Sequence, residues 1–251
     1  FQFISSYIRR PGVEVEPRET VNYSCDCIGG CRSDSCGCLV EDIEVDDFGD
    51  EINHGKIVPY QRGHNKLGQT MSVLRADYMK KSYADGERSE IIECNGNCGC
   101  GADCWNRVVQ KGRTLPLEIF MTPKCGFGKF PASSILRMSS NLWSGIRSPQ
   151  DIIKGQFIDL YLGEVITETE LESRELATDG APSYIFSLDW FQLKDVYYVD
   201  SLNFGTPTRF MNHSCNPNCR VFTVILNRAD KKVYGLAFFA TRDIPGGTEL
   251  N

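Results

Sequence analysis

Nine of the twelve cysteines fall into two clusters whose spacing suits metal coordination. The first cluster reads C-x-C-x3-C-x4-C-x-C and the second reads C-x3-C-x-C-x3-C. The C-x-C pairs place thiols too close together for each thiol to reach a separate, distant disulfide partner. Three tetrahedral zinc ions need twelve ligand positions, and nine thiolates supply them if three thiolates each bridge two metals. The predicted ligands are Cys25, Cys27, Cys31, Cys36, Cys38, Cys94, Cys98, Cys100 and Cys104.

A closed set of thiolates offers no open coordination position to water or substrate, so the predicted role of the zinc is structural. We expect nearby basic residues to offset the negative charge of the thiolates. These residues are Arg32, Arg107, Lys111 and Arg113. The competing interpretation is a secreted scaffold held by disulfides. The length of 251 residues, and a Phe1–Gly12 segment without signal-peptide features, weigh against it.

The composition is that of a globular protein with enough residues for one large or two modest domains, since 41% of the residues are hydrophobic. The net charge of -6 argues against a surface that coats DNA phosphates, and it favours a cationic partner. We therefore expect no direct sequence-specific DNA binding. No apolar run reaches the roughly 18 residues of a membrane-spanning helix, so we expect no membrane association.

The chain after Cys104 consists mainly of short segments rich in β-branched and aromatic residues, which predict strands. These segments are 115–121, 156–162, 184–190, 196–200, 220–226 and 233–240. One helix is predicted over 167–177, with Thr167 or Thr169 as its N-cap. Between the clusters, Leu39–Glu93 is polar and turn-rich and predicts a long loop in which His54 and His64 face solvent.

Three motifs in this β-rich part resemble the SET-domain protein lysine methyltransferases. They are CGFG at 125–128, GEVI at 163–166 and RFMNHSCNPN at 209–218. The nine-cysteine region resembles the pre-SET module, and NRVVQKGRTLPLEIF at 106–120 resembles fungal histone H3 lysine-9 methyltransferases of the suppressor-of-variegation class. The resemblance implies a mainly β fold of small curved sheets with one threaded (pseudoknot) segment, preceded by a trinuclear zinc module. The implied divisions are an N-terminal segment 1–24 packing on the core, a pre-SET module 25–104 and a SET domain 105–251.

The family's cofactor is S-adenosylmethionine, and the resemblance implies its binding residues. Gly126, Phe127 and Gly128 would let the cofactor approach the backbone under an aromatic ring, although a plain turn is the alternative interpretation. Asn212 and His213 resemble the pair whose polar groups hold the cofactor; a core pair satisfying its own turn is the alternative. Tyr184 and Arg209 are the remaining implied cofactor-binding residues.

The resemblance also implies a peptide groove and a lysine channel. Phe186, Leu188 and Asp189 resemble the strand on which the substrate peptide pairs by β-augmentation, where Asp189 would suit an arginine-rich tail. Tyr161 resembles the tyrosine that orients the target amine and is the predicted catalytic residue. A solvated charge and an ordinary buried tyrosine are the alternative interpretations of Asp189 and Tyr161.

The sequence departs from the family pattern in two places. The stretch 129–145 lengthens the distance from Gly128 to Gly155, so we expect it to be an insertion. Family members continue after GTEL with a second tyrosine and a cysteine-rich post-SET segment, whereas the sequence given ends at Asn251. A fourth zinc, with Cys215 as one ligand, is expected only with that segment. We accordingly expect little activity from the chain as given.

These observations predict an enzyme that transfers methyl groups from S-adenosylmethionine to histone H3, most directly to lysine 9, in heterochromatin formation. We expect a nuclear, chromatin-associated monomer whose partner is the histone H3 N-terminal tail. One alternative is a non-catalytic SET-like module that binds a histone tail or another protein. A third and weaker interpretation is a zinc scaffold alone.

Overall fold

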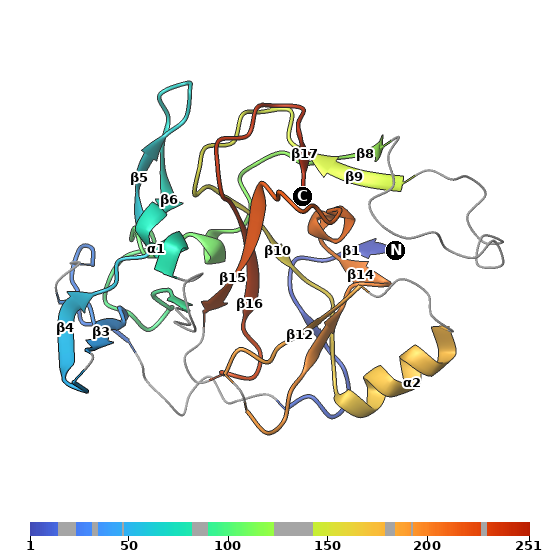
Figure 1. The fold of residues 1–251 in the computed structure, drawn as a ribbon, viewed down its shortest axis with the longest axis horizontal. Coiled ribbons are helices and arrows are strands. Elements are labelled where there is room, and N and C mark those ends of the chain that lie inside the picture. The colour runs from blue at the N-terminus through green and yellow to red at the C-terminus, as the bar shows by residue number, and fades with distance from the viewer. Residues whose placement is uncertain are drawn as a thin grey trace.

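The computed structural model describes residues 1–14, 24–31, 35–46, 48–81, 90–122, 143–178, 184–191, 193–226 and 230–251. Within these ranges the chain forms six small β-sheets and two α-helices, so the fold is mainly β as predicted (Figure 1). Each of the six segments predicted as strands overlaps a strand. None of the helices in the described part is long and apolar enough to cross a bilayer.

The central sheet has four strands in the order β10-β16-β15-β7 and joins the cysteine-rich half to the second half. Its strands are β7 (Ile91–Ile92), β10 (Phe157–Tyr161), β15 (Cys219–Ile225) and β16 (Gly235–Ala240). The side chains of Phe157, Phe222 and Phe239 pack on its buried face, with Phe239 completely buried. Strand β7 pairs in parallel with β15 and ends just before the second cysteine cluster. This pairing anchors the cluster to the core.

A second four-stranded sheet has the order β12-β13-β11-β2. Its strands are β2 (Ile8–Arg9), β11 (Glu164–Ile166), β12 (Ile185–Ser187) and β13 (Tyr198–Asp200). Helix α2 (Glu168–Thr178) follows β11 directly, and the Thr167 hydroxyl accepts a hydrogen bond from the Glu170 amide at 3.4 Å. The prediction of this helix and of a Thr167 N-cap is therefore confirmed.

The remaining strands of the second half form a three-stranded sheet, β17-β9-β8, and one small parallel pair. The sheet contains β8 (Glu118–Thr122), β9 (Trp143–Arg147) and β17 (Glu249–Leu250), and the pair is β1 (Gln2–Phe3) with β14 (Phe204–Gly205). The one-turn helices η1 (Val109–Lys111) and η3 (Pro207–Phe210) lie between these elements in sequence. The last three residues of the predicted insertion, Trp143–Gly145, form the first part of β9 and pair with β8.

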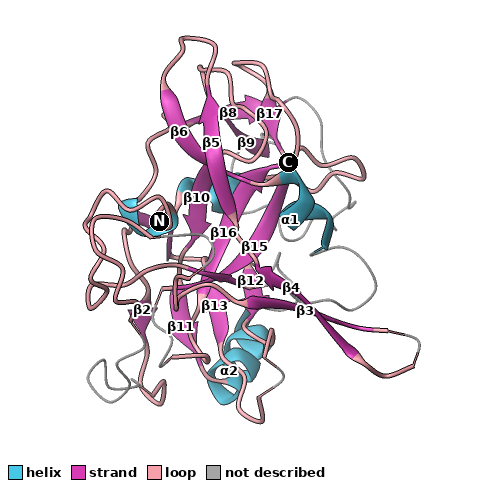
Figure 2. Ribbon diagram, turned by 90° about the vertical axis from the view of Figure 1, so that its left-hand side faces the viewer, coloured by secondary structure: helices cyan, strands magenta, loops and turns pink. Residues whose placement is uncertain are grey.

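The segment between the cysteine clusters is more regular than the sequence predicts. It contains two hairpins and a helix: β3 (Glu41–Val45) with β4 (Glu51–Lys56), β5 (Tyr60–His64) with β6 (Thr70–Leu74), and α1 (Ala76–Lys81). The Asp46 carboxylate accepts hydrogen bonds from two amides of the first turn, and the Asn65 side chain does the same in the second. Figure 2 shows the β3–β4 hairpin extending away from the central sheet. His54 and His64 are exposed on β4 and β5, as predicted.

Glu93 links the central sheet to the cysteine module (residues 25–104) through a buried carboxylate that is 1% exposed. It accepts hydrogen bonds from the Tyr60 hydroxyl at 2.7 Å and from the Val108 and Val109 amides at 2.8 Å each. The backbone amide and side-chain amide of Gln110 donate to its second oxygen. A buried anion of this kind is tolerated because every lone pair faces a donor.

We expect the Glu93→Gln substitution to destabilise the fold by about 2–4 kcal/mol, because the new amide group faces donors and leaves them unsatisfied. Urea denaturation followed by circular dichroism measures this loss. Glu172→Gln, at an exposed position on α2, is the control and should change stability by less than about 0.5 kcal/mol. Equal stability of the two variants would contradict the proposed role of the Glu93 carboxylate.

Candidate functional site: a cysteine cluster and the residues around Tyr161

The two cysteine clusters, separated in sequence, meet in one compact group of thiols. Eight of the nine predicted ligands are buried, and Cys27 is half-buried. The Sγ atoms of Cys25 and Cys31 lie 3.5 Å apart, and those of Cys31 and Cys94 lie 3.3 Å apart. Cys38 and Cys98 also approach to 3.5 Å. These separations exceed the 2.05 Å or so of a disulfide and approach the spacing of about 3.8 Å between thiolates on one tetrahedral zinc.

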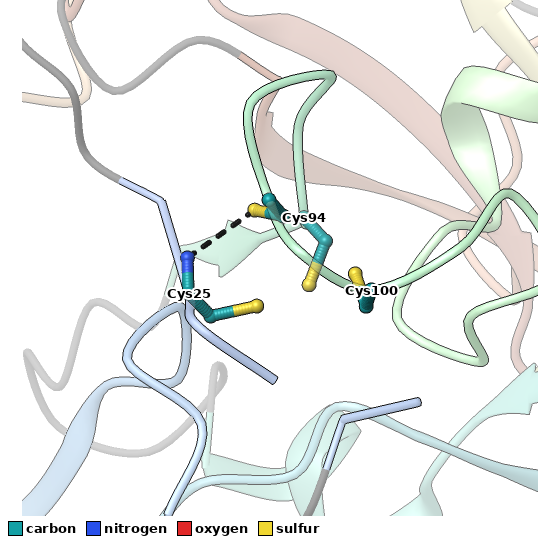
Figure 3. A group of neighbouring side chains, drawn as sticks. Cys25, Cys94 and Cys100 are labelled. Atoms are coloured by element: carbon teal, nitrogen blue, oxygen red, sulfur yellow. Dashed lines mark hydrogen bonds between the residues drawn. The ribbon is translucent and has the colours of Figure 1, made fainter. Parts of the chain in front are cut away.

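The thiols form three overlapping groups, each compact enough to hold a metal ion. The groups are Cys25, Cys94, Cys98 and Cys100; Cys25, Cys31, Cys36 and Cys94; and Cys31, Cys94, Cys100 and Cys104. Figure 3 shows Cys25 of the first cluster directed toward Cys94 and Cys100 of the second. Cys25, Cys31 and Cys100 each belong to two groups, as a thiolate that bridges two metals must, and Cys94 belongs to all three, whereas Cys27 and Cys38 belong to none. The donor set therefore fits zinc.

The surroundings of the thiols distinguish one basic residue from the others. Arg107 is 8% exposed and donates to the Cys100 thiol at 3.5 Å and to the Asn95 carbonyl at 2.6 Å. Burial raises the pKa of Cys100, but hydrogen bonds with Arg107 and with three neighbouring thiols together outweigh it and bring the pKa to about 7. Arg113, also predicted to offset the cluster's charge, instead pairs with Asp159 at 2.9 Å. Arg32 lies outside the described residues.

Tyr161, the predicted catalytic residue, ends strand β10 and is 4% exposed. Its hydroxyl donates to the Tyr184 carbonyl at 2.7 Å, and its ring lies 4.6 Å from that of Phe186. Burial raises the pKa of Tyr161 to about 12, although the Ser201 hydroxyl and the Arg209 cation oppose the shift. The phenol is therefore neutral and able to donate a hydrogen bond throughout the physiological pH range.

Arg209 and Tyr184, two predicted cofactor-binding residues, contact each other. The Arg209 guanidinium lies 4.0 Å from the centre of the Tyr184 ring and 4.9 Å from that of Phe210. Its Nε atom is buried and has no hydrogen-bond partner among the described residues. An unsatisfied buried donor on a cation suits an anionic group of a ligand, and the carboxylate of S-adenosylmethionine is such a group.

Asn212 connects this region to the sheet formed by β8, β9 and β17. Its side-chain amide donates to the Ser144 carbonyl at 3.2 Å and to a Glu249 oxygen at 2.7 Å. Gly145 leaves room for this contact, since a Cβ at this position would lie 2.8 Å from the Glu249 carboxylate. His213 is exposed. Gly126, Phe127 and Gly128 lie outside the described residues.

The predicted peptide groove lies at an edge of the second sheet. Strand β12 pairs with β13 on one side and is the terminal strand in the order of the described sheet. Phe186 packs on Tyr161, Leu188 is buried with it, and Asp189 is exposed. The Leu188 amide donates to the Tyr197 carbonyl at 2.8 Å. This bond shows which residues of β12 direct their backbone groups toward β13, because the direction alternates from one residue to the next. Ile185 and Ser187 consequently direct their amide and carbonyl groups away from β13.

Several residues that hold the group around Tyr161 in place do not appear among the sequence predictions. Glu249 holds Asn212, Ser201 donates from its amide to the Tyr184 carbonyl at 3.0 Å, and Asp200 and Glu164 are buried carboxylates beneath them. A signal for Glu164 exists in the sequence, because a glutamate inside the apolar run LGEVI predicts a buried, paired charge. No pattern in the sequence near Glu249 indicates its contact with Asn212.

A separate cavity of about 540 Å³ lies beside β10. Its lining includes Phe3, Arg113, Ile119, Asp159 and Pro207, and none of the described residues that were predicted to be catalytic or cofactor-binding lines it. It is therefore distinct from the group of residues around Tyr161.

Comparisons with known proteins cover both halves of the chain. The profile of the Pre-SET motif matches residues 1–107, and that of the SET domain matches residues 144–251. A Fusarium mangiferae protein, the H3 lysine-9 specific histone-lysine N-methyltransferase KMT1, is 36% identical over 275 residues, which cover 100% of this chain and 73% of the relative. The H3 lysine-9 specific enzyme dim-5 of Neurospora crassa is 35% identical over 264 residues, which cover 100% and 72%.

Solved structures agree with these relatives. The Neurospora SET domain protein DIM-5, a histone lysine methyltransferase, aligns with a TM-score of 0.72 and 32% identity, covering 100% of this chain and 87% of that chain. KRYPTONITE, in a complex with DNA, an H3(1-15) peptide and SAH, aligns with a TM-score of 0.64 and 25% identity, covering 100% and 40%. The chain belongs to the SET-domain histone-lysine N-methyltransferases that carry a pre-SET module.

Proposed function

We propose that this protein methylates lysine 9 of histone H3 with S-adenosylmethionine and acts on chromatin in the nucleus, in heterochromatin formation. The observation that carries the proposal is the full-length similarity to two enzymes described as H3 lysine-9 specific. The buried tyrosine beside an open strand edge supports it from the geometry. A non-catalytic binding module is not favoured, because these relatives are named as methyltransferases.

The target lysine must lose a proton before it can attack a methyl group. With an ordinary pKa near 10.4, the amine is almost entirely charged at pH 7, and neutrality costs about 4.6 kcal/mol. A channel formed by the rings of Tyr161 and Phe186 would lower that cost by desolvating the ammonium group. The Tyr161 hydroxyl stands at the polar end of this pair, where it orients the amine.

S-adenosylmethionine would supply the methyl group as a sulfonium, held by Tyr184, Arg209, Asn212 and His213. Arg209 contributes the unsatisfied Nε donor, and Tyr184 contributes the aromatic face next to it. Asn212 has both amide protons committed to Ser144 and Glu249, so its carbonyl oxygen is the atom left for the ligand. The glycines and phenylalanine of 126–128 complete the proposed set.

The substrate peptide would add a strand to the open edge of β12. Ile185 and Ser187 supply outward amide and carbonyl groups for main-chain hydrogen bonds. Asp189, exposed just after the strand, provides a negative charge for a basic tail. This arrangement would bind an extended, cationic peptide, and the N-terminal tail of histone H3 is such a peptide.

The cysteine cluster would hold three structural zinc ions through its nine thiolates. The support is the overlap of three four-thiol groups, with Cys25, Cys31, Cys94 and Cys100 each belonging to more than one group. Bridging thiolates lower the number of ligands that a trinuclear centre needs. Mass spectrometry of the native protein measures the zinc count directly, and a value near one would contradict the trinuclear arrangement.

Methyl transfer to peptides tests the function. The purified chain is incubated with radiolabelled S-adenosylmethionine and a peptide of H3 residues 1–15, and a peptide with arginine at position 9 is the control. We expect label in the first peptide only, and fragmentation should place it on lysine 9. Label in both peptides would reject the assignment of the residue. No label, in the presence of measurable cofactor binding by calorimetry, would favour the non-catalytic module.

The pH dependence of the reaction should report deprotonation of the substrate amine. We expect the single-turnover rate to rise about tenfold per unit between pH 7 and roughly 8.5, because the neutral amine becomes tenfold more abundant. Tyr161 does not titrate in this range, since burial holds its pKa at about 12. Tyr161→Phe should therefore lower the rate but keep the slope. A flat profile would contradict an amine that loses its proton within the observed range.

A further inference from the structure

Helix α2 is tied to the second sheet by one arginine that reaches three carboxylates. The Nη1 atom of Arg174 donates to Asp200 at 2.7 Å and to Glu164 at 3.0 Å. Its Nε atom donates to Glu170, one turn earlier on the helix, at 2.8 Å. The side chain is 21% exposed, and these contacts raise its pKa although burial opposes them.

The two sheet carboxylates are buried side by side, and Arg174 offsets the charge of both. Glu164 on β11 and Asp200 on β13 are direct cross-strand partners, and they are 1% and 2% exposed. Like charges opposite each other in a sheet repel, and an unpaired buried charge is costly. Arg10 also pairs with Glu164, whereas Arg174 is the cation that contacts both carboxylates. The end of β13 is therefore held in place by a residue of α2.

The end of β13 in turn fixes the hydrogen-bond partner of Tyr161. Ser201 follows Asp200 directly, is completely buried, and donates its amide to the Tyr184 carbonyl at 3.0 Å. The Tyr161 hydroxyl donates to that same carbonyl at 2.7 Å. The fit at this point is tight, because a Cβ on Gly163 would lie 2.4 Å from the Asp200 carbonyl oxygen. A shift of Asp200 consequently moves the partner of the tyrosine.

We infer that Arg174 is a positioning residue for methyl transfer, acting through Asp200, Ser201 and the Tyr184 carbonyl to orient the Tyr161 hydroxyl. The inference rests on the proposed function, since it assigns Tyr161 to the lysine channel. Rates depend steeply on such placement, and a misplacement of about 1 Å can cost about 100-fold. Arg174 itself contacts three carboxylates and not the Tyr161 hydroxyl.

A double-mutant cycle between Arg174 and Tyr161 tests the coupling. Arg174→Met alone should lower kcat by about 10- to 100-fold, with a change in peptide KM of less than about threefold. In the Tyr161→Phe background, which has no hydroxyl to orient, the same substitution should lower kcat by less than about threefold. An equal loss in both backgrounds would show that Arg174 does not act through Tyr161 and would overturn the inference.

Two matched variants separate positioning from loss of folding. Glu170→Gln removes only the contact within α2 and should keep kcat within about twofold of the original protein. Arg174→Lys keeps the charge and should recover part of the kcat lost in Arg174→Met. Cofactor stoichiometry from calorimetry normalises every rate to folded sites. If Arg174→Met merely lowers the fraction of competent sites, its normalised kcat will equal that of the original protein, against the inference.

A readout without turnover keeps this test independent of the methyltransferase assignment. In protein labelled with ¹³C at the tyrosine Cζ, the Tyr161 resonance is assigned by its loss in Tyr161→Phe. We expect Arg174→Met to shift or broaden that resonance and to leave Tyr60, which donates to Glu93, unchanged. An unchanged Tyr161 resonance would overturn the inference even if the protein methylates H3. Absence of any methyl transfer, together with a shifted resonance, would reject the function and retain the positioning of the tyrosine.

Discussion

Replacing Cys94 with serine is expected to remove most of the bound zinc and to unfold the cysteine module. Cys94 belongs to all three groups of thiols, so its loss takes a ligand from every proposed zinc site. Its thiol is completely buried and lies 3.3 Å from that of Cys31. Serine cannot replace it, because a hydroxyl is neither soft nor ionised at neutral pH. The effect should spread to the central sheet through β7, which immediately precedes this residue.

The expected magnitude is large because structural zinc contributes about 10 kcal/mol or more per ion to folding. Zinc per chain, measured by mass spectrometry, should fall from near three to below one, and the thermal transition should drop below about 40 °C or disappear. Cys215→Ser is the matched control, since this exposed thiol lies outside both clusters. A Cys94→Ser protein that retains its zinc and its thermal transition would refute the shared-thiolate arrangement.

Deleting residues 129–145 is expected to strengthen binding of S-adenosylmethionine by at least about tenfold. After the deletion Gly128 directly precedes Ile146, in the position that Gly145 now holds in β9. A Cβ at that position would lie 2.8 Å from the Glu249 carboxylate and 3.2 Å from the ring of Phe120, so a side chain there would push Glu249 away from Asn212. Glycine at 128 avoids this displacement, and Phe127 then takes the position of Ser144, whose carbonyl binds Asn212.

The expected changes in stability and in affinity have different sources. Thr122 and Trp143 are cross-strand partners, so the deletion leaves a three-residue connection, 123–125, between β8 and β9. A connection of that length is common in hairpins, and the shorter loop costs about 1–2 kcal/mol less to close, which raises stability. The gain in affinity comes from an aromatic ring next to the proposed cofactor residues in place of a serine, which adds apolar contact area.

A second deletion serves as the matched control for loop length. Removing 129–142 keeps Trp143, Ser144 and Gly145 in β9 but shortens the connection, so it should give the stability gain without the gain in affinity. Calorimetric titration of both proteins, and of the longer deletion carrying Phe127→Ala, separates the two sources. Equal affinity of the original chain and the 129–145 deletion would show that the insertion does not disturb the cofactor site.

Helices and strands that depend on residues close together in the sequence could be predicted. The helix at 168–178 has its N-cap and its acidic first turn in the sequence, and the strands after Cys104 have dense β-branched and aromatic residues. The hairpins of 41–56 and 60–74 were missed because their exposed strands are polar and show little alternation. Their order comes from turns capped by Asp46 and Asn65, whose effect is visible only once the strands pair.

The partners of the charged residues near the cysteines also depend on contacts that form only on folding. Arg107 and Arg113 are equally plausible partners of the thiolates from their positions in the sequence. The chain turn after η1 carries Arg113 toward β10, where the half-buried Asp159 is its partner. Burial raises the pKa of Asp159, and the Arg113 cation opposes that shift. Only the fold decides which of the two arginines faces the cysteines.

Residue types and short spacings already indicate the chemistry of this protein: nine thiols at metal-binding spacing, a family resemblance through the motif RFMNHSC, and the residue types around Tyr161. The order of residues in the chain contains all of these properties. Folding adds the contacts between distant residues, which show which thiols share a group, that Glu249 holds Asn212, and that Arg174 reaches Asp200. Such contacts join residues that are far apart in the chain, and their energies depend on burial and distance that exist only after the chain has folded.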